Sequence, residues 1–168
     1  MNKLQNKTAS SITLEINIAC EEWPGLNHLD GLIHASINAA MRAANCTVPA
    51  NAELSLLFSN DDALCKLNQR FRDICNPTNV LSFPFKQIKV GEVTDTMLGD
   101  IAFAYQTIAR ESKQLDIGFD RHLSHLIIHG FLHIFGYDHE NDADARTMET
   151  VEISALASLG IDNPYREV

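Results

Sequence analysis

The feature that most constrains this chain is the stretch HGFLHIFGYDH at residues 129–139. His129 and His133 are four residues apart, so on a helix they lie on one face with their Cβ atoms about 6 Å apart. Gly136 can end that helix in a left-handed turn, and the turn would bring His139 back toward the other two. The pattern therefore predicts an apolar helix that ends in a turn and presents three imidazoles to one point.

Three neutral imidazoles suit Zn²⁺ in tetrahedral geometry and leave its fourth position open, as in catalytic zinc sites. The spacing also matches the histidine and glycine framework of metzincin-type peptidases. In those enzymes the residue after the first histidine is a glutamate that acts as general base, whereas this chain has Gly130. The sequence thus predicts one zinc ion bound by His129, His133 and His139, and it disfavours a peptidase.

Other polar residues near this motif have several open roles. His125, four residues before the first predicted ligand, could support a ligand, line the cleft or simply pack. His122 continues the same helical face and need not bind metal, and Asp138 could orient an imidazole or hold the turn. His28 and His34 belong to another predicted helix, and we interpret them as structural.

Composition predicts a single domain over residues 1–168 that is long enough to bury a substantial core. No apolar run approaches the roughly 18 to 20 residues that a membrane-spanning helix needs. Residues 1–10 lack the apolar core of a secretory signal, so we expect a frayed lead-in, a cytoplasmic protein and no membrane partner.

The four cysteines are scattered along the chain and form no CxxC pair. Without an export signal, buried free thiols are a better interpretation than disulfides, and a cysteine-based zinc site is disfavoured. The residues concerned are Cys20, Cys46, Cys65 and Cys75.

The net charge of −9 argues against a nucleic-acid coat protein, which would carry a broad basic surface. It does not exclude a local basic cleft. Of the thirteen Lys and Arg residues, eight fall between Lys66 and Arg121, so a basic cleft would be expected in the middle of the chain. Scattered solubilising charge explains the same distribution equally well.

Hydrophobic periodicity and turn residues predict an α/β or α+β domain with a small sheet. The predicted strands cover residues 13–19, 53–59, 79–85 and 97–105. The predicted helices cover residues 27–45, 61–72, 106–115 and 118–136. A further helix is predicted to follow, with Asn141 or Asp142 as its N-cap. Asn60 is the predicted N-cap of the second helix. Pro84 fits an edge strand or a strand end, because proline cannot donate to a β-ladder.

These motifs together resemble the YbeY family of bacterial endoribonucleases, which act in ribosomal RNA maturation. HGFLHIFGYDH is similar to the family's histidine motif almost letter for letter. The resemblance continues through LNQRFR (67–72), PTNVLSFPF (77–85), LGDIAFA (98–104) and LGIDNPY (159–165). It covers roughly residues 50–165, and several motifs in the same order are far more specific than one short pattern.

The resemblance implies a zinc-dependent endoribonuclease for single-stranded RNA that acts in ribosomal RNA maturation, including 16S rRNA 3′ end processing, and in ribosome quality control. It implies zinc bound by His129, His133 and His139, and catalytic roles for His129 and Arg72. Arg72 would pair with a phosphate, whereas Arg70 would face elsewhere on the helix. Partners would be ribosomal RNA and the ribosome or its associated proteins.

The family's fold is a small, mostly parallel sheet of about four strands flanked by helices. The metal site would lie on a helix of the C-terminal half and the turn that follows. Lys86 and Arg121 are weaker candidates for RNA contacts. Phe83 and Phe85 could stack on bases, although phenylalanines are more often core residues.

Two other functions remain open at the level of the sequence. One is a zinc-dependent amide or peptide hydrolase that uses a distant carboxylate as base. The other is a metal-stabilised ribosome-assembly factor with marginal catalysis, which the acidic net charge would suit.

The nucleophile of the endoribonuclease could be a metal-activated water or the ribose 2′-OH. Imidazole ligands also suit nickel, copper and iron, and the sequence does not specify an oligomeric state.

Overall fold

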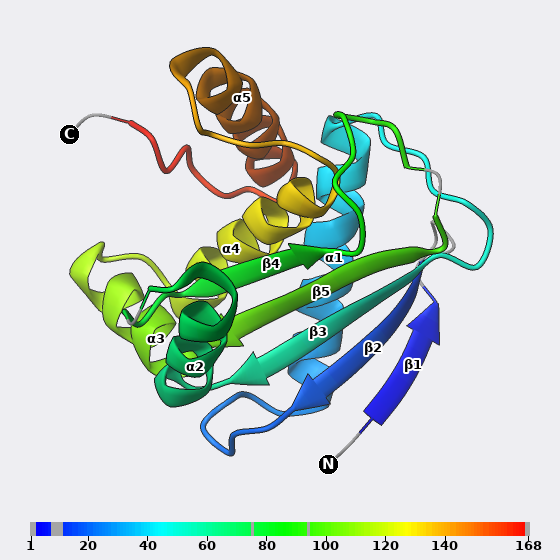
Figure 1. The fold of residues 1–168 in the computed structure, drawn as a ribbon. Helices are drawn as coiled ribbons and strands as arrows, with labels where there is room; N and C mark the ends of the chain where they lie inside the picture. Colours follow the sequence, from blue (N-terminus) through cyan, green and yellow to red (C-terminus); the bar gives the residue numbers. More distant parts are fainter. Residues whose placement is uncertain (1–2, 8–11, 75, 94, 167–168) are drawn as a thin grey trace.

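The computed structural model describes residues 3–7, 12–74, 76–93 and 95–166, which form a five-stranded sheet and five helices (Figure 1). The strands are β1 (Lys3–Lys7), β2 (Thr13–Ile18), β3 (Glu53–Ser59), β4 (Val80–Pro84) and β5 (Met97–Ala104). Their order across the sheet is β1-β2-β3-β5-β4. The inner pairs β2/β3 and β3/β5 are parallel, and the outer pairs β1/β2 and β4/β5 are antiparallel.

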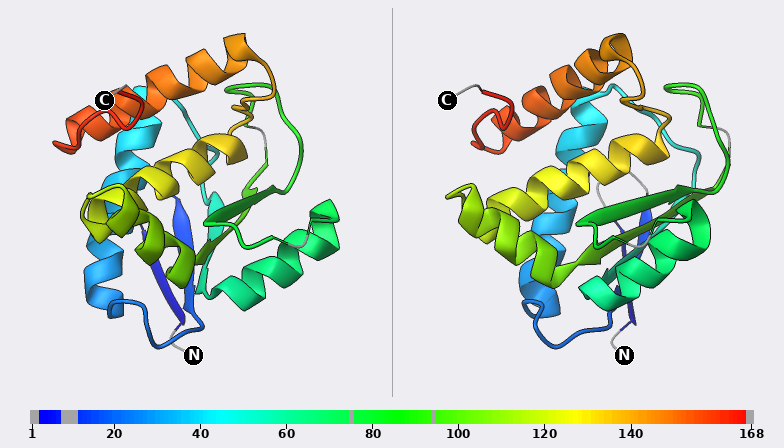
Figure 2. Two further views of the ribbon diagram at one scale, coloured as in Figure 1. Left: turned by 90° about the vertical axis from the view of Figure 1, so that its left-hand side faces the viewer. Right: turned by 60° about the vertical axis from the view of Figure 1, so that its left-hand side comes forward.

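The helices are α1 (Leu26–Ala43), α2 (Asp61–Arg72), α3 (Tyr105–Gln114), α4 (Phe119–Ile134) and α5 (Asp142–Ser158). Helices α1 and α4 cover one face of the sheet, and α5 packs on both of them as an outer layer (Figure 2). Helix α2 packs on the opposite face, against β4 and β5. None of these helices combines the length and apolar character that a bilayer crossing requires in the described part of the chain.

The alternation of side chains along β4 separates two apolar cores. Leu81 belongs to the small core under α2, and Phe83 packs against it. Ser82 points to the other face, where its hydroxyl donates to the carbonyl of Gly130 on α4 at 2.8 Å. The larger core lies on that second face, between the sheet and helices α1, α4 and α5. Strand β4 thus holds α2 and α4 at fixed positions on either side of one sheet edge.

The predicted α/β class is confirmed, and each predicted strand and helix is present with ends within two residues of the prediction. Asn60 caps α2, accepting from the backbone N–H of Ala63 at 2.9 Å, and Asn141 caps α5. Pro84 ends β4, which is an edge strand as predicted.

Two expectations for the sheet are wrong. Residues 3–7 form β1 instead of a frayed lead-in, because their backbone pairs with β2; residues 1–2 and 8–11 lie outside the described residues. The sheet accordingly has five strands, one more than the four that the sequence pattern marks. Only its two central pairings are parallel, so it is a mixed sheet and not a mostly parallel one.

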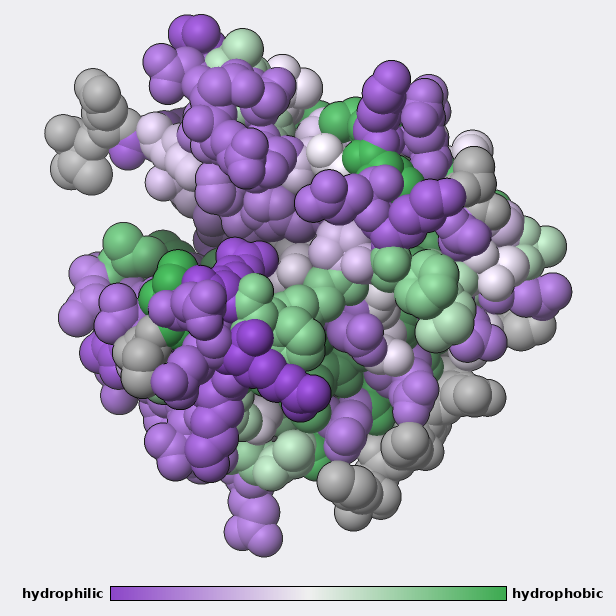
Figure 3. Space-filling view, viewed as in Figure 1, coloured by the Kyte–Doolittle hydropathy of each residue, from purple (hydrophilic) through white to green (hydrophobic). Residues whose placement is uncertain are grey.

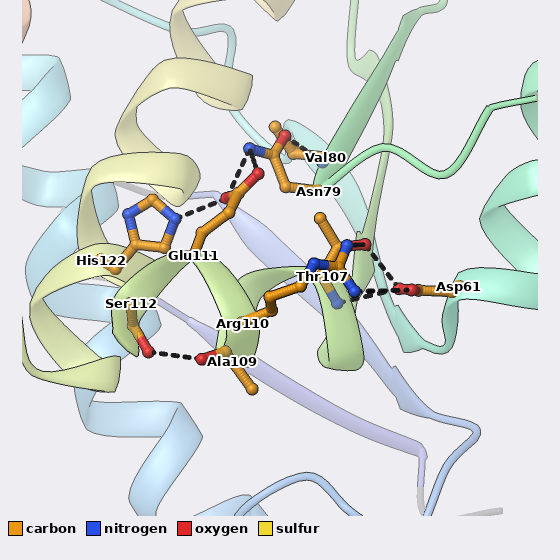
Figure 4. Close-up of polar contacts among 9 residues, drawn as sticks. All are labelled: Asp61, Asn79, Val80, Thr107, Ala109, Arg110, Glu111, Ser112 and His122. Carbon is orange, nitrogen blue, oxygen red and sulfur yellow. Dashed lines mark hydrogen bonds and ion pairs between the residues drawn. The ribbon is translucent and has the colours of Figure 1, made fainter. Parts of the chain in front are cut away.

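A polar network fixes the start of β4 to helices α3 and α4 (Figure 4). Asn79 donates from Nδ2 to both carboxylate oxygens of Glu111, at 3.0 and 3.2 Å, while its Oδ1 accepts from the backbone N–H of Val80 at 2.7 Å. His122 on α4 donates to the same carboxylate at 2.7 Å. Burial alone would raise the pKa of Glu111, but the hydrogen bonds from His122 and Asn79 and the nearby positive charges hold it below its usual value.

A groove of about 610 Å³ lies on the sheet face that carries α2. Leu57, Leu67, Phe71, Phe83 and Phe85 contribute to its apolar lining. Figure 3, viewed from the same side as Figure 1, shows apolar surface across the middle of this face. The two phenylalanines proposed for base stacking therefore line a groove on the side of the sheet opposite to α4.

Candidate active site

The structure brings the three predicted metal ligands together. Helix α4 places His129 and His133 on one face, with their Nε2 atoms 3.1 Å apart. After the turn at Gly136, the ring of His139 lies with its centroid 5.6 Å from that of His129 and 5.0 Å from that of His133. One nitrogen from each of the three imidazoles lies within 4.8 Å of the other two.

Gly136 is required at the turn for two reasons. Its φ of +87° is in the left-handed region that favours glycine. A Cβ at this position would also lie 2.6 Å from the carbonyl oxygen of Ile88, in the connection between β4 and β5. The predicted left-handed end of the helix is confirmed, and the close approach of the Ile88 backbone is an additional constraint that the sequence does not reveal.

The hydrogen bonds of the two helical histidines determine which nitrogen faces the site. His133 Nδ1 is 3.0 Å from the carbonyl oxygen of Tyr137, and His129 Nδ1 is 2.5 Å from a carboxylate oxygen of Glu152. Both oxygens can only accept, so both Nδ1 atoms carry the proton. In the neutral rings the two Nε2 lone pairs then face each other. Lone pairs at 3.1 Å repel unless a proton or a metal ion lies between them, so the two Nε2 atoms can serve as a pair of ligands to one metal ion.

The donor set fits zinc in chemistry and spacing. Two nitrogens at a zinc–nitrogen distance of about 2.05 Å in a tetrahedral site are about 3.3 Å apart, close to the Nε2 separation in the structure. Histidines that bind metals almost always donate their other N–H to a carboxylate or a backbone carbonyl, as His129 and His133 do. The cluster could therefore hold a metal ion.

Burial around the cluster favours the protonation states that metal binding needs. Burial, assisted by the neighbouring imidazoles of His129 and His139, lowers the pKa of His133 to about 4, so the His133 ring is neutral at neutral pH. Burial would raise the pKa of Glu152, but hydrogen bonds from His125, His129 and Tyr165 lower it to about 2. Glu152 is therefore an ionised acceptor for the His129 N–H.

Gly130 faces the sheet and not the metal cluster. A Cβ there would lie 3.0 Å from Ile101 Cγ2, 3.1 Å from Ser82 Oγ and 3.2 Å from Val80 Cγ2. Because α4 packs this closely on β4 and β5, a glutamate at this position would meet the sheet. The structure thus gives a packing reason for the absent peptidase base.

Arg72 and two of the three histidines line one cleft of about 530 Å³. Arg72 is the last residue of α2 and is exposed, and the described residues offer it no carboxylate partner within ion-pair distance. Arg70 lies over the ring of Phe71, 5.4 Å from its centroid, and does not line the cleft. The two arginines therefore lie at different places, Arg72 on the cleft and Arg70 outside it, and the catalytic role of Arg72 stays a prediction.

The remaining candidates divide between the cleft and other sites. Lys86 lines the cleft, whereas Arg121 lines a separate groove beside α1, so its expected RNA contact is not supported by its position. Asp138 accepts from the backbone N–H of His139 at 2.7 Å and so holds the turn. His28 pairs with Asp120 at 2.9 Å, which links α1 to α4 and agrees with the structural role predicted for it.

The side chains that most directly support the cluster were not predicted. Glu152 is fully buried on α5, and Tyr165 donates its hydroxyl proton to the same carboxylate. The sequence feature that could have pointed to Glu152 is the presence of a glutamate between Met148 and Leu156 on the apolar face of α5. His125, whose role was open, lies 3.3 Å from the hydroxyl of Tyr165.

The cysteines that the structure describes are partly buried, less so than predicted, and form no disulfide with one another. They are Cys20, Cys46 and Cys65. Cys75 lies outside the described residues.

An α/β domain with a three-histidine cluster at an open cleft belongs to the class of proteins that could carry a catalytic metal. Comparison with known proteins identifies the family. The family model described as Endoribonuclease YbeY matches residues 17–160. The chain therefore belongs to the Endoribonuclease YbeY family, and the resemblance seen in the motifs is confirmed. Its members are named as endoribonucleases, which are enzymes that hydrolyse RNA phosphodiester bonds.

Relatives of known name match the chain over nearly its whole length. Endoribonuclease YbeY of Chelativorans sp. (strain BNC1) is 42% identical over 158 residues, covering 94% of this chain and 96% of the relative. Endoribonuclease YbeY of Rhizobium meliloti (strain 1021) is 40% identical over 161 residues, covering 93% and 96%. The solution structure of TM1509 from Thermotoga maritima covers 90% of this chain and 99% of that protein, with a TM-score of 0.52 and 21% identity, and it shows the likeness of fold alone.

Proposed function

We propose that this chain is a zinc-dependent endoribonuclease that cuts single-stranded RNA during ribosomal RNA maturation. The observation that carries the proposal is the pair of Nε2 atoms 3.1 Å apart, beside a third imidazole and in a cleft shared with Arg72. Membership of a family named for endoribonuclease activity supports the reaction class. The proposed tasks are processing of the 16S rRNA 3′ end and ribosome quality control.

His129, His133 and His139 would hold the zinc ion, which when bound supplies Lewis-acid chemistry toward a phosphoryl oxygen. The protein's own contribution is to orient the ligands and, by burial, to keep the His133 ring neutral through its lowered pKa. The carbonyl of Tyr137 fixes His133, and the carboxylate of Glu152 fixes His129. The lone pairs of both rings are thereby directed into the site before any ion arrives.

Arg72 would bind the phosphate that is cleaved. Its guanidinium can donate two parallel hydrogen bonds to phosphate oxygens and oppose the charge that develops on them. Lys86, on the same cleft, would bind a neighbouring phosphate of the strand. The proposed metal site, Arg72 and Lys86 thus lie on one cleft, although the protein as a whole has a net charge of −9.

The acidic net charge also bears on how RNA reaches the cleft. A protein of net charge −9 gains little general attraction to RNA from its surface. We propose that the ribosome or a ribosome-associated protein presents the strand, which places the enzyme in the cytoplasm with its substrate. Peptide hydrolysis is disfavoured, because Gly130 packs against the sheet where the peptidase base would be needed.

The proposal is tested by measuring metal content and cleavage of a single-stranded RNA, with and without ribosomes, for the wild type and three variants. Arg72→Ala should keep its metal and lose about 100-fold or more in kcat, by analogy with other oxyanion-stabilising groups. Arg70→Ala, two residues away but outside the cleft, should keep both metal and activity. His129→Ala should lose both.

A wild-type protein that holds stoichiometric metal but cleaves no RNA in either condition would refute the nuclease. Equal activity of Arg72→Ala and Arg70→Ala would refute the role of Arg72. Cleavage of an unstructured peptide by the wild type would instead favour the amide-hydrolase alternative.

A further inference from the structure

Glu152 is a carboxyl group buried among apolar side chains. It has no exposed surface, and its buried neighbours on α5 are Met148, Ala155 and Leu156. A buried charge is costly unless specific partners compensate it. The partners here come from two other segments: His129 and His125 on α4, at 2.5 and 3.7 Å, and Tyr165 in the segment that follows α5.

The local geometry of the C-terminal segment directs Tyr165 at Glu152. The backbone N–H of Tyr165 donates to the side-chain oxygen of Asn163 at 2.8 Å, which closes a turn through the LGIDNPY motif. The ring of Tyr165 packs edge-on against that of His125, with centroids 5.7 Å apart and an interplanar angle of 87°. The motif thus folds back over α4 at the metal cluster.

The hydrogen-bond roles in this group follow from the donors available. Tyr165 has one hydroxyl proton, and it goes to Glu152, which can only accept. The hydroxyl oxygen can then accept from His125 Nε2, 3.3 Å away. The other oxygen of Glu152 accepts from His129 Nδ1. The chain of contacts therefore runs from the C-terminal segment through one carboxylate to a proposed metal ligand.

We propose that Glu152 and Tyr165 are positioning residues of the metal site, Glu152 by fixing the tautomer and ring plane of His129, and Tyr165 by holding that carboxylate in place. The inference deepens the proposed function and rests on it for the identity of the site. It assigns to the LGIDNPY motif a task in metal binding, although no residue of that motif is a proposed ligand.

A second metal site built from His125, His129 and Glu152 is a different interpretation of the same residues, since their ligand atoms also lie within 4.8 Å of one another. The 2.5 Å separation between His129 Nδ1 and Glu152 argues against it. Two atoms that bind one zinc ion are about 3.3 Å apart, so this distance leaves room for a proton and not for an ion. The carboxylate supports a ligand instead of forming a second site.

The test uses metal-stripped, full-length protein titrated with Co²⁺, and with Zn²⁺ against a chelator. Glu152→Gln should bind both ions about 10 to 100-fold more weakly, the usual cost of losing such a partner, and should change the Co²⁺ absorption spectrum. Tyr165→Phe should bind about fivefold more weakly, as for the loss of one hydrogen bond.

Two matched controls separate positioning from folding. Glu111→Gln makes the same change at a carboxylate that also pairs with a histidine of α4, but with His122, which is not a proposed ligand. Tyr105→Phe makes the same change as Tyr165→Phe in the aromatic cluster around Trp23. Both controls should bind Co²⁺ within about twofold of the wild type and give its spectrum.

Wild-type affinity and spectrum in both Glu152→Gln and Tyr165→Phe would overturn the inference. If Glu152→Gln fails to fold, Tyr165→Phe decides, because Tyr165 is 39% exposed in the C-terminal segment and its substitution leaves the core intact. RNA cleavage is scored separately. If the wild type cleaves no RNA but the Glu152 and Tyr165 variants bind metal more weakly, the proposed function is rejected and this inference stands. If the wild type cleaves RNA and both variants bind metal as it does, the proposed function stands and this inference is rejected.

Discussion

Gly136→Ala should destabilise the protein by about 2–5 kcal/mol, through two costs that the structure separates. For an alanine at φ +87°, the left-handed conformation costs about 1–2 kcal/mol. Its Cβ would in addition lie 2.6 Å from the backbone oxygen of Ile88. Because backbone cannot rotate away as a flexible side chain can, relieving this contact should cost a further 1–3 kcal/mol or so.

Gly91→Ala is the matched control for this substitution. Gly91 has a φ of +82°, nearly the same as Gly136, but a Cβ at this position would have no atom within 4 Å. Gly91→Ala should therefore lower the free energy of unfolding only by the conformational cost, about 1–2 kcal/mol. Urea unfolding of both variants in excess chelator gives the two free energies of unfolding without a contribution from bound metal.

The difference between the two variants measures the contact with Ile88. Equal destabilisation of Gly136→Ala and Gly91→Ala would refute the argument that the turn and the connection between β4 and β5 are packed backbone against backbone. Because the same turn carries His139, Gly136→Ala should also weaken metal binding, whereas Gly91→Ala should not.

Three further predictions concern packing, pH and metal. Gly130→Glu, which recreates the peptidase pattern, should lower the free energy of unfolding by about 3 kcal/mol or more and produce no peptidase activity, since the new carboxylate meets β4 and β5. The folded state lowers the pKa of Glu111, so this carboxylate stabilises the protein at pH values above its ordinary pKa of 4.5, and the stabilisation is lost as the pH falls. Glu111→Gln should therefore make the free energy of unfolding fall less steeply as the pH is lowered. Free Zn²⁺ at 100 times its dissociation constant should stabilise the wild type by about 2.7 kcal/mol and leave His129→Ala unchanged.

Each of these has a clear contrary result. A stable Gly130→Glu protein with peptidase activity would show that α4 can move away from the sheet and expose that side chain to the metal site. Parallel acid limbs for the wild type and Glu111→Gln would remove the network in Figure 4 as a source of acid sensitivity. Zinc stabilisation of His129→Ala equal to that of the wild type would place the ion elsewhere.

Local signals explain why most of the fold could be predicted. Asn60 and Gly136 mark helix ends through backbone rules that act within a few residues, and Pro84 excludes a central strand in the same way. The three histidines could be grouped because a helical turn and one glycine determine their relative positions.

Features that depend on tertiary contacts could not be predicted. Strand β1 has the polar sequence KLQNK and pairs with β2 through its backbone, so hydrophobic alternation does not reveal it. The partnership of His129 with Glu152 joins α4 to α5 across 23 residues and depends on how those helices pack. The reason for Gly130, close contact with Ser82 and its neighbours, likewise exists only once α4 lies on the sheet.

A zinc titration of metal-stripped protein, followed by cleavage of single-stranded RNA under single-turnover conditions, decides whether one zinc site performs the reaction. We expect no cleavage without metal and an activity that rises linearly and stops at one equivalent of Zn²⁺, as for one site formed by His129, His133 and His139. Full cleavage by the metal-free protein, or activity that does not follow zinc occupancy, would contradict the proposed metal-dependent nuclease.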